Sequence, residues 1–245
     1  MANPETEQGS RLSHLRPELK TPQMSLRKLP AEKAAYLDGL RRDIVFSDTL
    51  RGITLTYHTT WGLFSPKGVD EGSRLLLDHL DVNPEDDTLD LGCGYGPLGL
   101  TLARLAPRGS SMLVDKDFVA VEYSRRNARQ NGIDNVEILL SNGFDQVGER
   151  HFDLIVSNLP AKTGKELYYL YFYDALVRMK PGARFYVVTI NGLRKFVQRA
   201  FMEVFGNYRK LKQGRTYTVA MATLSDRPSR EPLAASGQET ETTLF

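Results

Sequence analysis

The sequence predicts an α/β protein with a doubly wound, seven-stranded, mostly parallel sheet that ends in an antiparallel hairpin. Two observations lead to this fold class. From about residue 70, short apolar segments alternate with helical segments, which is typical of a parallel sheet covered by helices on both faces. After the last helical segment, residues 207–213 and 215–224 form two strand-like segments joined by a turn at Gln213-Gly214, and strands linked so closely pair antiparallel.

Each element has its own signal. Five short apolar segments predict the parallel strands, at residues 88–92, 110–115, 135–141, 152–158 and 183–190. Helical composition predicts helices at residues 70–80, 97–106, 118–132, 165–179 and 193–206, and Asp70 is the expected N-cap of the first. Ahead of this pattern, residues 31–42 have helical composition, and residues 52–60 alternate as a half-exposed strand does.

The composition of the chain sets the expected domain boundaries. Residues 1–30 and 225–245 are polar and poor in large apolar groups, which predicts flexible N- and C-terminal tails. Residues 70–224 carry the regular pattern and make one core domain, and residues 31–69 are expected to be an extension that packs on it.

Charge and cysteine content limit the partners and the compartment. The formal net charge of +2 does not mark the whole molecule as a polycation, so a polyanionic partner has to be inferred from local charge. Cys93 is the only cysteine in the sequence, which excludes an intramolecular disulfide and indicates a reducing compartment. The sequence has no apolar run of membrane-spanning length, no signal-peptide pattern and no Cys/His spacing that suggests a metal. We therefore expect a cytoplasmic protein without a membrane segment or a metal.

A glycine-rich loop, DLGCGYGPLG at residues 90–99, follows the first parallel strand and precedes a helix. One interpretation is the dinucleotide fingerprint G-x-G-x-x-G, formed by Gly94, Gly96 and Gly99. Asp115 lies near the distance at which that motif places a ribose-binding acid. The glycines would let the backbone approach a nucleoside ligand closely.

The same letters contain the acid-x-G-x-G-x-G loop of S-adenosylmethionine-dependent enzymes, formed by Asp90, Gly92, Gly94 and Gly96. Three features favour this second interpretation. The Asp90 carboxylate would face a positively charged methionine group, whereas it would repel a pyrophosphate. The terminal hairpin is expected of methyltransferases and not of the dinucleotide fold. Asn158 follows the fourth strand of the core domain, where methyltransferases place their substrate loop.

With these pieces in place, the chain resembles the class I S-adenosylmethionine-dependent methyltransferases, whose fold is Rossmann-like. More narrowly, it is similar to the ribosomal RNA small-subunit (guanine-N2) methyltransferase C family. The resemblance covers roughly residues 50–223 and rests on the segments WGLFSPKGVDEGSRLLL, LDLGCGYGPLGL and SNLPAKTGKEL. It implies that residues 70–224 are a methyltransferase domain, that S-adenosyl-L-methionine is the cofactor, and that both sites lie at the carboxyl ends of the strands.

The resemblance also implies a set of cofactor-binding residues. Asp115 would hold the ribose hydroxyls, and Asn142 stands where many relatives have an Asp that accepts from the adenine amino group. Phe64, in the entry segment, either helps to close the cofactor pocket or packs in the core. The full set is Phe64, Asp90, Gly92, Cys93, Gly94, Gly96, Asp115, Lys116, Asn142, Gly143 and Asn158.

The segment SNLPAKTG, residues 157–164, is the expected acceptor loop. A guanine amine is unprotonated at neutral pH, so the catalytic groups need only be hydrogen-bond acceptors, and we expect Asn158 Oδ1 and the Leu159 carbonyl in this role, next to Pro160. The family's usual loop is Asn-Pro-Pro and then an aromatic or other apolar residue, so Leu159 and Ala161 depart from it. Ala161 cannot stack on a base. The candidate stacking residues are instead Trp61, Phe64, Phe144 and Tyr168.

A local excess of positive charge favours RNA as the substrate. The segment from Asn191 to Thr216 carries seven Lys and Arg residues against one acid, Glu203, which suits phosphate contacts, although a solvated helix and hairpin would give the same pattern. The candidate substrate-binding residues are Lys162, Lys165, Arg194, Lys195 and Arg215. The predicted function is N-methylation of a guanine exocyclic amine in ribosomal RNA. The alternatives are methylation of transfer RNA, a protein or a small molecule, or a non-catalytic cofactor- or RNA-binding protein.

Overall fold

The computed structural model describes residues 30–225, and the chain falls into two compact units divided between Gly39 and Leu40. The first unit is described from residue 30 on, as most of helix α1 (Ala31–Arg41), which buries none of its residues. The helix expected at residues 31–42 is therefore present. The two predicted tails lie outside the described residues, apart from residue 30 and residue 225.

The second unit is built on the seven-stranded sheet that the sequence predicts, with the strand order β5-β4-β3-β6-β7-β9-β8. Strands β3 to β7 run parallel, β9 is antiparallel to β7, and β8 is antiparallel to β9. The strands are β3 (Thr88–Leu91), β4 (Ser111–Asp115), β5 (Val136–Leu140), β6 (Phe152–Asn158), β7 (Met179–Ile190), β8 (Arg209–Gln213) and β9 (Tyr217–Thr223). The predicted parallel strands and terminal hairpin are confirmed.

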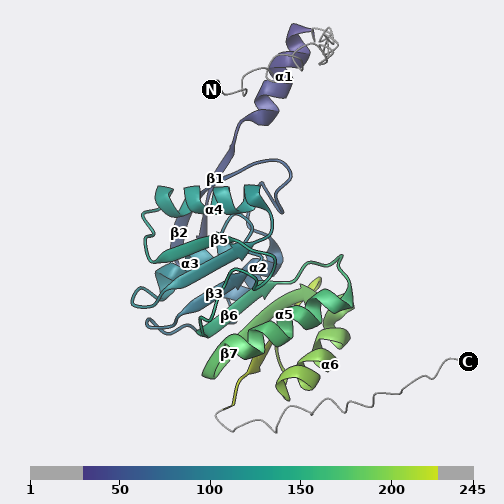
Figure 1. Ribbon diagram of the computed structural model, residues 1–245. Helices are drawn as coiled ribbons and strands as arrows, with labels where there is room; N and C mark the ends of the chain where they lie inside the picture. The colour runs from purple at the N-terminus through teal and green to yellow at the C-terminus, as the bar shows by residue number, and fades with distance from the viewer. Residues whose placement is uncertain (1–29, 226–245) are drawn as a thin grey trace, which may run out of the picture. The chain divides into compact units, whose positions relative to one another are not determined.

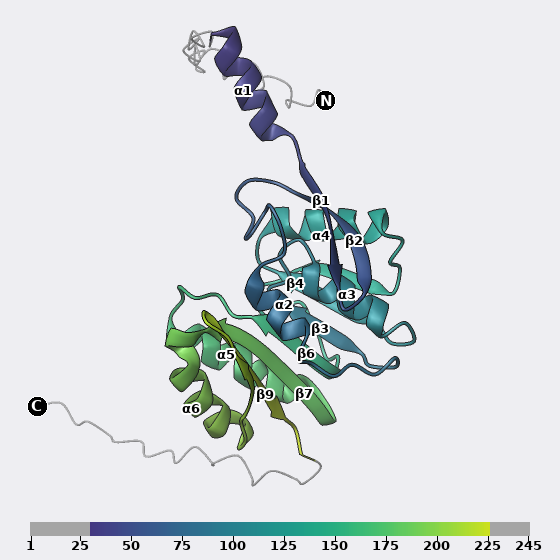
Figure 2. The same cartoon turned by 180° about the vertical axis from the view of Figure 1, so that it is seen from behind.

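Helices cover both faces of this sheet because alternate residues of a strand point to opposite sides. On β7, Tyr186 and Val188 belong to the core cluster that includes α2, α3 and α4, whereas Phe185 and Val187 belong to the cluster that includes α5 and α6. Figure 1 shows α5 and α6 over one face of the sheet, and Figure 2 shows α2 and α3 from the other side. The helices are α2 (Glu71–Leu77), α3 (Pro97–Leu105), α4 (Phe118–Gln130), α5 (Lys165–Arg178) and α6 (Arg194–Phe205).

A hairpin ahead of the sheet contains a strand that the sequence analysis did not predict. Strand β1 (Ile44–Leu50) pairs antiparallel with β2 (Ile53–Thr59), and the two form a sheet of their own. Helix α4 supplies polar partners for β2: the Asn127 side chain accepts from His58 N at 2.8 Å and donates to His58 O at 3.0 Å. The Asn127 amide thus makes the two backbone hydrogen bonds of His58 that a neighbouring strand would otherwise make. The hairpin is thereby tied to the core of its unit.

Strand β7 begins at Met179, not at residue 183 as predicted. The Lys-Pro-Gly segment does follow the end of α5, as expected, but Met179 already pairs with Phe152 of β6. Gly182 N also donates to Leu224 O at 2.9 Å, so the Pro-Gly step lies within the sheet's hydrogen-bonding pattern. Helix α5 therefore passes into β7 without a loop. The prediction was wrong because Pro-Gly usually marks a turn between elements, whereas here it lies within the strand.

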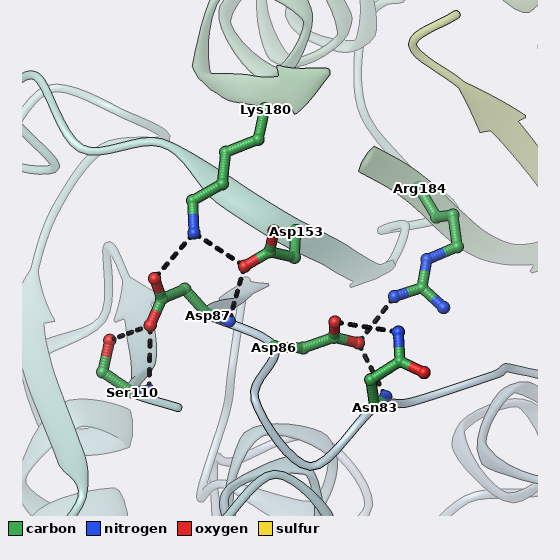
Figure 3. A network of polar contacts seen from close by, with 7 residues as sticks. All are labelled: Asn83, Asp86, Asp87, Ser110, Asp153, Lys180 and Arg184. Carbon is green, nitrogen blue, oxygen red and sulfur yellow. Dashed lines mark hydrogen bonds and ion pairs between the residues drawn. The ribbon is translucent and has the colours of Figure 1, made fainter. Parts of the chain in front are cut away.

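A polar network lies at the amino ends of β3, β6 and β7, at the edge of the sheet away from the strands' carboxyl ends (Figure 3). Lys180 Nζ donates to Asp87 Oδ2 at 2.8 Å and to Asp153 Oδ2 at 2.7 Å. Ser110 donates to Asp87 Oδ1 from its backbone N at 3.0 Å and from its hydroxyl at 2.8 Å. Burial alone would raise the pKa of Asp87, but these hydrogen bonds outweigh it and hold that pKa below its usual value.

The other half of the network joins β7 to the loop before β3. Arg184 donates to Asp86 Oδ2 at 2.6 Å, and Asn83 holds the same carboxylate through its backbone N at 2.8 Å and its amide at 3.2 Å. The Asp86 side chain is only 7% exposed, and a buried carboxylate requires such partners. Ionic contacts therefore clamp three neighbouring strands at this edge.

Lys180→Met is expected to lower the free energy of unfolding by about 1 kcal/mol at pH 7, because it leaves two partly exposed carboxylates facing each other. A group whose folded-state pKa is lowered stabilises the fold above its unfolded value of 3.8, and this contribution is lost as the pH falls through the lowered pKa. Urea denaturation should therefore show a smaller difference between Lys180→Met and wild type at pH 3 than at pH 7. Lys195→Met, at an exposed lysine of α6, is the control; a pH-independent difference for Lys180→Met would contradict the assignment.

Candidate functional site

A cavity of about 550 Å³ opens at the carboxyl ends of β3, β4 and β6. This is the edge at which open parallel sheets bind their ligands. Of the predicted site residues, those that line it are Phe64, Gly92, Cys93, Gly94, Asp115, Lys116, Gly143, Asn158, Leu159, Pro160 and Lys162. Those that do not line it are Asp90, Gly96, Asn142, Lys165, Arg194, Lys195 and Arg215. The glycine loop and the expected acceptor loop thus border one cavity.

The glycine loop has the backbone shape that its sequence indicates. Gly92, Gly94 and Gly96 have φ angles of 80°, 57° and 98°, a region that favours glycine. A Cβ added at Gly92 or Gly94 would meet no atom within 4 Å, so these two positions leave open space beside the cavity. Gly99 has a different role, because a Cβ there would come within 2.3 Å of the Leu113 side chain. It allows α3 to pack closely on β4.

Asp115 ends β4 and lines the cavity beside the glycine loop. Its Oδ2 accepts from Gly94 N at 2.8 Å, and its Oδ1 accepts from Asp117 N at 2.9 Å. Each oxygen of an ionised carboxylate has a second lone pair. The two backbone contacts therefore fix the carboxylate and leave it able to accept from a pair of ligand hydroxyls.

Asp90 lies outside the cavity, on the α3 side of the sheet, because its neighbours Leu89 and Leu91 belong to the opposite core cluster. Its Oδ2 accepts from Gly99 N at 2.8 Å, while its Oδ1 is buried with no hydrogen-bond partner among the described residues. Burial raises the pKa of Asp90 to about 7, a rise opposed by the Gly99 hydrogen bond and increased by the charge of Asp115. In this geometry Asp90 anchors the first turn of α3 to β3.

The loop after β5 contributes Ser141 and Gly143 to the cavity, whereas the side chain of Asn142 is exposed between them and donates to Asp145 at 3.4 Å. Gly143 lies against Tyr171 of α5, because a Cβ there would come within 2.8 Å of that ring. Tyr171 also lines the cavity. The sequence did not predict that Tyr171 lines the cavity, because α5 contains several tyrosines and their spacing does not show which one reaches it.

Asn158, at the end of β6, has a fixed amide orientation. Its Nδ2 donates to Asp70 Oδ2 and to Ser73 Oγ, both at 3.1 Å. An ionised carboxylate can only accept a hydrogen bond, so the NH₂ group has to face Asp70. Oδ1 is consequently the atom of the amide directed away from that pair. Asp70 caps α2 as predicted, accepting from Ser73 N at 3.1 Å. The sequence did not indicate that Ser73 belongs to the site.

The next residues are held by the sheet and by α5. Leu159 N donates to Val188 O of β7 at 3.0 Å, and the Leu159 side chain is buried in the core cluster beneath α5. The hydroxyl of Tyr168 donates to Pro160 O. Leu159, which stands where the family usually has a proline, therefore has its side chain in the core, and the residue also lines the cavity.

Most of the predicted basic residues lie away from the cavity: Lys165 begins α5, Arg194 and Lys195 begin α6, and Arg215 lies in the turn between β8 and β9. Arg194 donates to Gln213 at 2.5 Å, and Lys165 Nζ lies 6.0 Å from the centre of the Phe196 ring. The side chains of Lys195 and Arg215 are exposed. These positions suit contacts with an extended ligand outside the cavity, and Lys162 alone of this set borders the cavity itself.

Within residues 30–225, no helix has the length and apolar character needed to cross a membrane. The same residues include no group of three or more His, Cys, Asp or Glu side chains placed to bind a metal ion.

The fold and the cavity are those of a class I methyltransferase. The glycine loop follows β3, and β9 runs antiparallel to the parallel strands of the sheet. The family model described as methyltransferase small domain matches residues 54–221. This protein belongs to that family.

Three known proteins illustrate the similarity. The uncharacterized protein YbxB of Bacillus subtilis is 38% identical over 145 residues, which cover 58% of this chain and 72% of YbxB. The ribosomal RNA small subunit methyltransferase C of Cronobacter sakazakii is 34% identical over 183 residues, 72% of this chain and 52% of that enzyme. The solved structure of the T. thermophilus 16S rRNA N2 G1207 methyltransferase, in complex with AdoMet and guanosine, has a TM-score of 0.68 and 30% identity, and covers 74% of this chain and 50% of its own. This chain thus spans about half the length of the two named methyltransferases.

Proposed function

We propose that this protein transfers a methyl group from S-adenosylmethionine to the exocyclic amine of a guanine in ribosomal RNA. The relatives support both halves of the proposal, because the Cronobacter protein is named a ribosomal RNA methyltransferase and the T. thermophilus protein was solved with AdoMet and guanosine. Membership of the methyltransferase small domain family supports the reaction type.

The residues of the cavity fit S-adenosylmethionine. The open space at Gly92 and Gly94 leaves room for a ligand against the backbone, and the Asp115 carboxylate can accept from two ribose hydroxyls. The wall made by Gly143 and Tyr171 offers an apolar surface to a flat ring system. These residues would hold the cofactor without help from Asp90, which is engaged with α3.

When bound, the cofactor supplies a methyl group on a sulfonium, which passes to the amine nitrogen by in-line displacement while the amine's proton leaves to water. The protein has to hold the amine in line, and positioning of this kind lowers a barrier by up to about 7–11 kcal/mol. Asn158 Oδ1 and the Leu159 carbonyl accept from the amine and direct its lone pair. Neither group needs to remove a proton in advance, because the amine is neutral at pH 7.

The orientation of the Asn158 amide is the observation that carries this proposal. Its Nδ2 is bound by Asp70 and Ser73, so its acceptor oxygen remains for the substrate in the cavity that also contains the glycine loop. The basic side chains of α6 and β8 add contacts that suit the phosphates of a large RNA. They are Arg194, Lys195, Arg199, Arg209, Lys210 and Lys212.

A second candidate function is methylation of a different acceptor, such as transfer RNA, a protein or a small molecule. Leu159 and Ala161 favour it, because the loop offers no aromatic side chain that could stack on a guanine. It requires the same cofactor site and the same amide orientation, and differs only in what enters the mouth of the cavity.

Methyl incorporation from labelled S-adenosylmethionine tests the proposal on three substrate fractions: total RNA, protein extract and metabolites. We expect label in the ribosomal RNA after the RNA fraction is separated by size, and N2-methylguanosine after digestion of that RNA to nucleosides. Label confined to protein, metabolites or transfer RNA would overturn the ribosomal RNA assignment in favour of the second candidate. A folded sample that fails to bind S-adenosylhomocysteine in calorimetry would overturn both.

A further inference from the structure

We propose that Trp61 and Phe64 form a stacking surface for unpaired RNA bases at the mouth of the cavity. The inference rests on the proposed function, because it assumes that the methyl acceptor is a base of an RNA. It assigns the base stacking that Ala161 cannot provide to another loop of the chain. This aromatic loop, residues 60–69, connects β2 to α2.

Burial separates the four aromatic residues that the sequence offers for stacking. Phe144 and Tyr168 are 2% and 1% exposed and belong to the core, so neither can receive a base. Trp61 and Phe64 are 47% and 65% exposed. Phe64 lines the cavity, and a large apolar side chain left this exposed at the edge of a cavity requires an explanation. Trp61 precedes it by three residues in the same loop.

The aromatic loop is held firmly although its two rings are exposed. Leu63 and Val69 are buried, and they anchor the loop in the core cluster. The hydroxyl of the buried Tyr95 lies 3.2 Å from both Ser65 O and Gly68 O and shares its single proton between these carbonyls, and Ser65 Oγ donates to Gly68 O at 2.7 Å. Because the backbone is fixed before a ligand arrives, little entropy is lost when a base stacks on the rings.

Positive charge accompanies the exposed rings. Lys67 Nζ lies 4.9 Å from the centre of the Trp61 ring, and Lys162 is exposed and lines the cavity that Phe64 also lines. An aromatic face combined with ammonium groups matches the base and phosphate of a single-stranded nucleotide. Phe64 would receive the target base and Trp61 a neighbouring one. A fully paired duplex offers no free base face, so the expected ligand is single-stranded RNA.

Trp61 is the only tryptophan of the chain, so emission excited at a wavelength that the 11 tyrosines barely absorb reports on this surface alone. Titration with a short single-stranded RNA is expected to quench the tryptophan emission. Polyphosphate, which has the charge but no bases, and a duplex of the same sequence are expected to leave the emission nearly unchanged. Unaltered emission with single-stranded RNA at a concentration that saturates a filter-binding assay would overturn the proposal.

Substitutions test each ring separately. Phe64→Ala and Trp61→Ala should each weaken binding of single-stranded RNA by about 5- to 150-fold, the range that corresponds to the loss of one stacked base. Phe64→Leu keeps the apolar character without the ring and should lose nearly as much, whereas Trp61→Phe should restore most of the affinity. Tyr173→Ala is the matched control, because Tyr173 is 48% exposed on α5 and does not line the cavity.

Binding of S-adenosylhomocysteine separates this inference from the proposed function. Trp61→Ala should leave that binding unchanged in calorimetry, because Trp61 does not line the cavity. For Phe64→Ala, a loss of S-adenosylhomocysteine affinity equal to the loss in RNA affinity would assign Phe64 to the cofactor and overturn its role in stacking. Wild-type protein that methylates RNA while Trp61 does not respond would refute the stacking surface and leave the methyltransferase proposal intact. Failure of the wild type to bind S-adenosylhomocysteine would count against the proposed function itself.

Discussion

The Asn158→Ala protein is expected to turn over about 100- to 1000-fold more slowly than wild type, the loss typical of removing one preorganised polar group from a reacting centre. Its affinity for S-adenosylhomocysteine should stay near that of wild type. In the proposed mechanism Asn158 Oδ1 accepts from the acceptor amine, whereas the glycine loop and Asp115, which would hold the cofactor, do not depend on that oxygen. Single-turnover kinetics and calorimetry together separate the two effects.

Asp70 should act on the same step through Asn158. Asp70→Ser keeps an N-cap for α2, since serine caps helices well, but its side chain is too short to reach Asn158 Nδ2. The remaining partner, Ser73 Oγ, can donate as well as accept, so it permits either orientation of the Asn158 amide. We therefore expect about a 10-fold lower kcat with little change in stability or in cofactor affinity. Asp70→Asn should recover most of the rate, because its amide oxygen can take the place of Oδ2.

A matched control is available on α4, which begins with the same kind of cap. Asp117 accepts from Val119 N at 2.8 Å and does not line the cavity, so Asp117→Ser makes the same chemical change away from the acceptor loop. It should leave kcat unchanged. If Asp70→Ser and Asp117→Ser reduced kcat equally, or if Asp70→Ser lowered the melting temperature in proportion to its loss of activity, Asp70 would be a structural residue only.

The free energy of unfolding of Asp90→Asn is expected to rise relative to that of wild type as the pH increases. The difference between the two proteins should be roughly 2–3 kcal/mol larger at pH 8 than at pH 5. Asp90 has a usual pKa of 3.8 and a pKa of about 7 in the fold, mainly because of burial. Asparagine keeps an oxygen for Gly99 N at 2.8 Å but carries no charge at any pH. Urea denaturation of both proteins at several pH values between 4 and 8 measures the effect.

The direction follows from the proton balance. Between pH 3.8 and about 7 the folded protein holds a proton on Asp90 that the unfolded chain has lost, so this group makes the fold less stable as the pH rises through that window. Asp87, whose pKa is lowered, acts in the opposite direction and at lower pH. Parallel stability curves for wild type and Asp90→Asn between pH 4 and 8 would mean that Asp90 does not take up a proton on folding.

The core of the fold could be predicted because its signals are local. Apolar segments such as residues 152–158 form strands wherever helices can cover both faces, and glycines at 92, 94 and 96 have φ angles that few other residues adopt. Strand β1 escaped prediction because Ser47, Asp48 and Thr49 give it a polar pattern, and its partners come from β2 alone.

The candidate site was predicted less completely than the fold, because it depends on contacts between residues that are far apart in the sequence. Sequence position brings Asp90 near the glycine loop, but strand alternation turns its side chain towards α3. Ser73 and Tyr171 line the cavity because α2 and α5 reach its rim, and no spacing within either helix shows which residue will do so. The partner of the Asn158 amide likewise depends on a contact between residues 88 positions apart.

The basic edge strand β8 has a consequence for the behaviour of the protein in solution. An edge strand exposes unpaired backbone groups, and like charges along it discourage a second copy from adding to the sheet. Arg209, Lys210 and Lys212 are exposed on β8, so the charges that suit RNA phosphates also protect against self-association. Neutralising β8 should therefore promote aggregation as well as weaken RNA binding. Neutral variants of Arg194 and Lys195 on α6 remove charge without exposing a sheet edge, and they are the better probes of RNA contact.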